Sequence, residues 1–187
     1  ITPNVLDSWS LILKEVKGSF LLIYSDSEAA KVNLINEIIL RGVDSKRVIF
    51  LRSLPRPEYL ARYRVADLFL DTRPYNAGTT ASDALRMGLP LLTMRGDSFN
   101  SREASGILSA LNLPELITST PKEYELLAIE LATNSEKFRL VKEKLHSNLL
   151  TAALYNTSLF TKNLESAYQQ IYERGQQGLD FDHIYVK

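Results

Sequence analysis

Apolar positions along residues 1–120 follow two alternating patterns. Where apolar side chains recur every three or four residues they predict helices, and the short continuous apolar runs between these segments predict strands buried in a parallel sheet. The predicted helices cover residues 3–16, 28–41, 57–63, 80–87 and 101–111, and the predicted strands cover residues 19–24, 47–50, 67–71, 89–94 and 115–117. This alternation is typical of βαβ units, so we expect an α/β fold with a parallel sheet and flanking helices.

The pattern changes after residue 120, where only helical periodicity remains. Three further helices are predicted over residues 121–132, 135–148 and 158–174. We therefore divide the chain into a core, residues 1–120, and a helical extension of the same domain, residues 121–187. The last three helices could cover one face of the sheet or reach toward a neighbouring domain.

Composition excludes several classes of function. The 22 basic and 22 acidic residues of this 187-residue chain cancel, which argues against nucleic-acid and anionic-membrane partners. The absence of cysteine excludes disulfides and a thiol nucleophile, and it fits a cytoplasmic location. No apolar run approaches the roughly 20 residues that span a bilayer. The chain begins at Ile1 within helical sequence, so we expect it to be a piece of a longer polypeptide.

The segment FLDTRPYNAGTTASD, residues 69–83, predicts an anion site where a strand turns into a helix. Gly78, Thr79 and Thr80 would offer backbone N–H groups, hydroxyls and the positive end of a helix dipole to a diphosphate. Asp83 suits paired ribose hydroxyls. The alternative is a capping box, with Thr80 as N-cap and Asp83 three positions later. The residues alone leave both interpretations open, and we interpret Asp71 as a turn-former.

Neighbouring loops carry further polar side chains. Arginines at positions 52, 56 and 62 suit phosphate or base carbonyl groups, and Tyr59 either stacks on a base or is a half-buried helix residue. The polar loop 95–102 either closes over a ligand or is a surface connection. We expect no metal site, because neither His146 nor His183 has a ligand partner at suitable spacing. The chain contains no Walker A, G-x-G-x-x-G or G-x-S-x-G motif.

The run ADLFLDTRPYNAGTTASDALRMGLPLLTMRGDSFNSREASGIL, residues 66–108, resembles the carboxyl-terminal half of the O-linked N-acetylglucosamine transferase and SPINDLY family, in a bacterial-type form. The opening ITPNVLDSWSLILKEV and the ending YNTSLFTKNLESAYQQIYERG resemble it too. The resemblance implies the second Rossmann-like, nucleotide-sugar-binding domain of a GT-B glycosyltransferase. The first domain and tetratricopeptide repeats would precede it in the full-length protein.

The resemblance also implies roles for individual residues. Gly78, Thr79 and Thr80 would hold the donor diphosphate, and Asp83 the ribose. The base and nucleotide site would consist of Arg56, Tyr59 and Arg62. Two positions depart from the animal enzymes, which carry a histidine at the position of Gly78 and another at that of Tyr59. A pyrophosphate-binding lysine would lie upstream of Ile1, and the general base would lie outside this chain.

The implied reaction is inverting, metal-independent transfer of GlcNAc, or another sugar, from a nucleoside diphosphate to serine or threonine of proteins. UDP-GlcNAc is the favoured donor and GDP-fucose the alternative, with no further cofactor. The missing amino-terminal repeats would bind the acceptor proteins, so we expect the isolated fragment to be inactive. The alternative function is a non-catalytic nucleotide-binding regulatory module. A complete enzyme such as a phosphatase or epimerase is the weakest interpretation, because no nucleophile has convincing partners.

Overall fold

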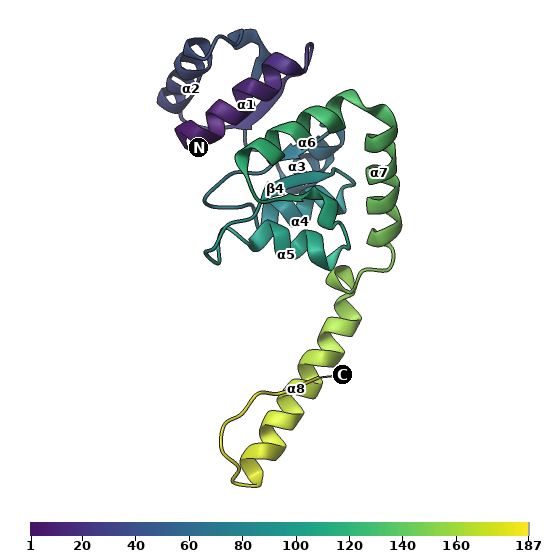
Figure 1. The fold of residues 1–187 in the computed structure, drawn as a ribbon. Coiled ribbons are helices and arrows are strands. Elements are labelled where there is room, and N and C mark those ends of the chain that lie inside the picture. The colour runs from purple at the N-terminus through teal and green to yellow at the C-terminus, as the bar shows by residue number, and fades with distance from the viewer. Residues whose placement is uncertain (187) are drawn as a thin grey trace.

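A computed structural model describes residues 1–186 and places five parallel strands between helices (Figure 1). Strand β1 (Leu21–Tyr24) pairs with β2 (Val48–Leu51). A second sheet has the order β3-β4-β5, formed by Phe69–Leu70, Leu91–Met94 and Ile117–Thr118. The predicted α/β class with parallel strands is confirmed, although the strands form two sheets rather than one.

Eight helices surround these strands in residues 1–186. They are α1 (Pro3–Glu15), α2 (Glu28–Leu40), α3 (Arg56–Arg62), α4 (Thr79–Arg86), α5 (Glu103–Ala110), α6 (Pro121–Thr133), α7 (Ser135–Leu149) and α8 (Thr157–Gln176). Local chemistry sets several ends. Thr120 and Glu123 form a capping box before α6. Gly88, with φ +81°, ends the turn after α4, as glycine readily does in the left-handed region.

Two apolar clusters hold the fold together. In the first, α1 and α6 pack around the β1–β2 sheet, and the buried Trp9 indole N–H donates to the Tyr124 hydroxyl at 3.3 Å. The second lies among α4, α5 and α7 and includes Leu85, Leu108 and Leu145, each fully buried. Leu68, just before β3, packs against both clusters. The loops that follow β3 and β4 therefore leave a rigid part of the molecule.

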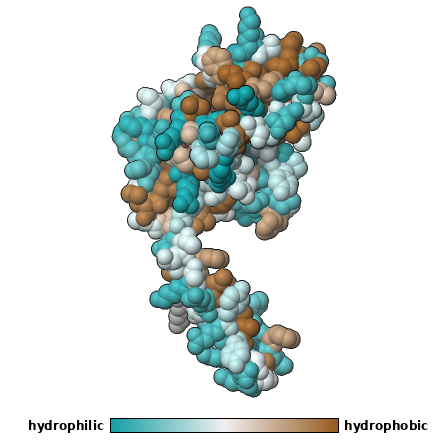
Figure 2. All heavy atoms as spheres, turned by 180° about the vertical axis from the view of Figure 1, so that it is seen from behind, coloured by the Kyte–Doolittle hydropathy of each residue, from teal (hydrophilic) through white to brown (hydrophobic). Residues whose placement is uncertain are grey.

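The first strand is less buried than the sequence predicts. Phe20 and Tyr24, in the run expected to be covered on both faces, are 57% and 54% exposed. Helix α2 covers little of this sheet. Within the described residues, Ile38 is the one buried side chain of the helix. Apolar side chains consequently gather on the surface of this lobe, at the upper right of Figure 2.

The predicted helical extension, residues 121–187, contains two different parts, and its last residue lies outside the described ones. Helix α6 packs on α1 and β4, and α7 packs on α6, so both belong to the body of the domain. Helix α8 instead projects away from it (Figure 1), and each of its side chains is at least partly exposed within residues 1–186. None of the described helices is long and apolar enough to cross a membrane.

Candidate functional site

Asp71 organises the loop between β3 and α4. Its side chain is 4% exposed, and its Oδ1 accepts hydrogen bonds from the backbone N–H groups of Thr72 and Ala77, both at 2.8 Å. The Thr93 hydroxyl, on the neighbouring strand β4, donates to its Oδ2 at 2.6 Å. The predicted turn-forming role of Asp71 is confirmed, since one carboxylate ties both ends of the loop to β4.

Burial raises the pKa of Asp71 to about 6, because the charged carboxylate is poorly solvated in this position. The three hydrogen bonds from Thr93, Ala77 and Thr72 favour the charged form and lower the pKa, while the nearby Glu103 carboxylate raises it. Desolvation outweighs the hydrogen bonds, so Asp71 titrates within the range from mildly acidic to neutral pH.

Asn76 joins the loop after β3 to the loop after β4. It is 1% exposed, its backbone N–H donates to the Asn100 carbonyl at 2.9 Å, and its side-chain amide donates to the Thr72 carbonyl at 2.8 Å. Its Oδ1 has no partner among residues 1–186. Ser101 in turn fixes the second loop, because its hydroxyl accepts from the Ser98 N–H at 2.9 Å. Both loops are therefore braced against each other.

Helix α4 begins at Thr79 with Gly78 as N-cap, so Thr80 lies inside the helix. The capping-box alternative, with Thr80 as N-cap, is wrong for this reason and because Asp83 bonds elsewhere. Gly78 has no side chain with which to cap the first N–H groups of the helix, and the side chains of Thr79 and Thr80 are exposed. The start of α4 thus presents uncapped donors and two hydroxyls to solvent.

Asp83, on the same helix, is held by two side chains from α3. The Arg56 guanidinium donates to both carboxylate oxygens, at 2.9 and 2.7 Å, and the Tyr59 hydroxyl donates at 3.2 Å. Asp83 is 8% exposed, whereas the Arg56 side chain is 60% exposed. The hydrogen bond to Asp83 raises the pKa of Arg56. Three predicted site residues, 27 positions apart at most, therefore meet at one point.

Two cations lie over the Tyr59 ring, with the guanidinium carbons of Arg56 and Arg62 at 5.3 and 5.5 Å from its centre. Arg62 also donates to the Arg52 carbonyl at 2.9 Å. The Tyr63 ring meets Tyr59 edge-on at 5.3 Å, and burial raises the pKa of Tyr63. All three residues predicted for the base site thus share one surface of α3, with Tyr59 packed rather than open for stacking.

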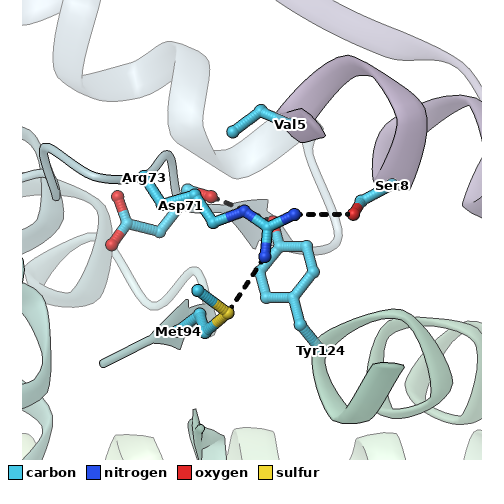
Figure 3. Close-up of a pocket in the computed structure, with 6 residues that line it drawn as sticks. All are labelled: Val5, Ser8, Asp71, Arg73, Met94 and Tyr124. Carbon is cyan, nitrogen blue, oxygen red and sulfur yellow. Dashed lines mark hydrogen bonds between the residues drawn. The ribbon is translucent and has the colours of Figure 1, made fainter. Parts of the chain in front are cut away.

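A hollow of about 690 Å³ opens beside the braced loops, lined by the beginning of α1, residues 73–74, residues 96–101 and the beginning of α6. A second, much smaller cavity lies deeper (Figure 3). There Arg73 places its guanidinium between Met94 Sδ at 3.0 Å and Ser8 Oγ at 3.2 Å. Arg73 also donates to the Asn4 carbonyl at 3.1 Å, so it links α1 to the loop after β3.

The sequence interpretation missed several of these residues. Arg73, Thr93 and Asn76 were not assigned to the site, although the first and last lie inside the singled-out segment. Glu103 was also missed, yet its carboxylate lies against Gly78. No local motif marks any of them, because each also has a neighbour in another element, far away in the sequence.

Comparison with known families identifies the relationship. The family model described as Glycosyl transferase family 41 matches residues 1–164. The chain belongs to glycosyl transferase family 41. This family 41 chain is 30% identical over 184 residues to the UDP-N-acetylglucosamine--peptide N-acetylglucosaminyltransferase of Caenorhabditis elegans, covering 98% of this chain and 16% of that protein.

Two further comparisons agree. The chain is 28% identical over 182 residues to the probable transferase SPINDLY of Arabidopsis thaliana, covering 95% of this chain and 20% of that protein. An O-GlcNAc transferase mutant of Thermobaculum terrenum has a similar solved structure, with a TM-score of 0.86 and 31% identity over 95% of this chain and 35% of that one. The family 41 chain thus spans a fifth or less of these curated relatives. The family resemblance read from the sequence is confirmed, and so is the GT-B type of fold.

Proposed function

We propose that this family 41 chain is the donor-binding part of a protein O-glycosyltransferase that uses a nucleotide sugar, with UDP-GlcNAc as the favoured donor and GDP-fucose as the alternative. The observation that carries the proposal is the meeting of Asp83, Arg56 and Tyr59 beside the uncapped start of α4. The names of the relatives, which are peptide N-acetylglucosaminyltransferases, support a transferase rather than a non-catalytic regulatory module.

The diphosphate would bind at Gly78, Thr79 and Thr80. The first N–H groups of α4 and the two exposed hydroxyls would donate to phosphate oxygens, and the helix dipole would favour their negative charge. When the bond between the sugar and the diphosphate breaks, negative charge grows on the departing phosphate. Fixed donors at this point would stabilise that charge in the transition state, which is the contribution of this chain to catalysis.

The ribose and base would bind at Asp83, Arg56, Tyr59 and Arg62. The Asp83 carboxylate accepts hydrogen bonds from Arg56 and Tyr59 in the structure. Ribose hydroxyls would therefore replace Arg56 at one or both oxygens, and the guanidinium of this 60% exposed side chain would turn to the nucleotide. Binding in this proposal exchanges an internal ion pair for contacts with the ligand.

The remaining steps would use other parts of the full-length protein. The general base that activates the acceptor hydroxyl and the repeats that bind acceptor proteins would both lie outside this chain. Transfer would be inverting and would need no metal ion. The cytoplasmic location expected from the sequence stays a prediction.

Calorimetry tests the proposal directly. UDP and UDP-GlcNAc, with GDP and GDP-fucose as the alternative pair, are titrated into the natural full-length protein and into its Asp83→Ala variant. We expect one pair to bind and the variant to bind it more weakly. Heat from none of the four nucleotides would refute the site. The donor sugar is then identified by transfer to acceptor protein with each sugar nucleotide in turn.

A further inference from the structure

A carboxylate lies directly beside the proposed diphosphate site. A Cβ atom built on Gly78 would come within 1.9 Å of Glu103 Oε1 and 2.5 Å of its Cδ, so the carboxylate fills the space in which a side chain at position 78 would begin. Gly78 has φ −102°, so a positive φ is not the reason for glycine at this position. A side chain at position 78 would have to displace the Glu103 carboxylate.

Glu103 has no cation beside it that would offset its negative charge among the described residues. It begins helix α5, where the helix dipole favours an anion. It takes part in none of the ion pairs formed within residues 1–186. Its charge reaches the loop before α4: burial is the main cause of the raised pKa of Asp71, and Glu103 raises it further. An uncompensated negative charge is therefore built into a site that we propose binds an anion.

We propose that Glu103 discriminates between the nucleotide-sugar donor and the free nucleoside diphosphate product. This inference rests on the proposed function. In the donor, the β-phosphate is esterified to the sugar and carries one negative charge. In the product it is a terminal phosphate, which carries close to two charges at pH 7 because the second pKa of such a group is about 6. A carboxylate beside this phosphate repels the product more than the donor.

The expected size of the discrimination follows from Coulomb's law. One additional unit charge about 4 Å from a carboxylate changes the affinity about fivefold at the dielectric constant of water, and more where water is excluded. The consequence for the enzyme is functional. Glu103 would weaken binding of the product more than binding of the donor, so it would limit product inhibition and favour release after transfer.

The test measures dissociation constants of three ligands by calorimetry, for the natural full-length protein and its Glu103→Gln variant. The ligands are UDP, the β-methyl ester of UDP and UDP-GlcNAc; the corresponding GDP series is used if the protein prefers guanine. The methyl ester has the phosphate charge of the donor without its sugar. We expect Glu103→Gln to tighten UDP about fivefold more than it tightens the methyl ester or UDP-GlcNAc, because each of these carries one phosphate charge fewer.

Two further variants complete the experiment. Glu115→Gln removes the same charge from a side chain paired with Lys144, and all three constants should stay unchanged. Glu103→Ala should tighten UDP as Glu103→Gln does, which covers the case in which one variant unfolds. Unchanged UDP affinity in a folded Glu103 variant, or equal tightening of UDP and its methyl ester, would overturn the inference alone. If the wild-type protein binds none of the UDP or GDP ligands, the proposed function fails, and this inference with it.

Discussion

The titration of Asp71 should be visible in the stability of the fold. Its pKa is about 6 in the folded protein against 3.8 for an ordinary aspartate, and burial is the cause. Below about pH 4 the group is protonated in both states and does not lower the free energy of unfolding. Between about pH 4 and 6 only the folded state holds the proton, so the free energy of unfolding falls as the pH rises. Above about pH 6 both states are deprotonated at this group, and the free energy of unfolding falls no further on its account.

The magnitude follows from the same shift. A difference of about two pH units corresponds to about 3 kcal/mol at about 1.4 kcal/mol per unit. Asp71→Asn removes the charge but retains an Oδ1 that can accept from Thr72 and Ala77, and its amide can donate to Thr93 Oγ1. We therefore expect this variant to be about 1–3 kcal/mol more stable than the wild type at pH 8 and equally stable near pH 4.

Urea unfolding at pH 4, 6 and 8 measures this difference, followed by the fluorescence of Trp9, which is the one tryptophan of the chain and is buried in the first apolar cluster. Asp71→Ala is the control, because it leaves the donors of Thr72, Ala77 and Thr93 without their acceptor. It should be less stable than the wild type by about 1–3 kcal/mol for each donor left unsatisfied. An Asp71→Asn protein with the wild-type pH dependence would refute the reasoning.

Three other predictions concern the ligand site and the core. Asp83→Ala should weaken UDP binding about tenfold or more. Its effect on stability should be smaller, because the Arg56 side chain that it releases is already well solvated. Calorimetry measures the affinity and urea unfolding the stability, and a loss of stability with unchanged affinity would contradict the site. Arg56→Ala and Arg62→Ala should each weaken nucleotide binding, and calorimetry in which neither does so would move the base site elsewhere. Leu145→Ala should cost about 2–5 kcal/mol in urea unfolding, because the side chain is fully buried; a cost below about 1 kcal/mol would show that α7 is loosely packed.

The order and type of the elements could be predicted from the sequence, because each depends on local periodicity and on local end signals. Helix α1, predicted over residues 3–16, spans Pro3–Glu15, and α6, predicted over 121–132, spans Pro121–Thr133. The division of the strands into two sheets could not be predicted. The reason is that the periodicity of a strand carries no information on which strand lies next to it.

Some of the site residues could be predicted from the sequence. The turn-forming role of Asp71 is a local property, and the residues with predicted roles at Arg56, Tyr59 and Asp83 do meet. Their functions stay predictions. The capping-box question could not be decided locally, because the partner of Asp83 is Arg56, 27 positions earlier in the chain. Glu103 had no signal at all, since its approach to Gly78 depends on the packing of α5 beside α4.

The separation of the two sheets has a mechanical consequence. No ladder of backbone hydrogen bonds joins the two sheets in the described chain. Helix α1, which packs against the β1–β2 sheet, is instead linked to α6 by the Trp9–Tyr124 hydrogen bond and to the loop after β3 by Arg73. Such a junction can slide without breaking any strand pairing. Amide hydrogen exchange should therefore reveal two units with different opening free energies, β1–β2 exchanging first and β3–β4 last, so that the strands carrying the ligand loops stay intact while the amino-terminal lobe moves.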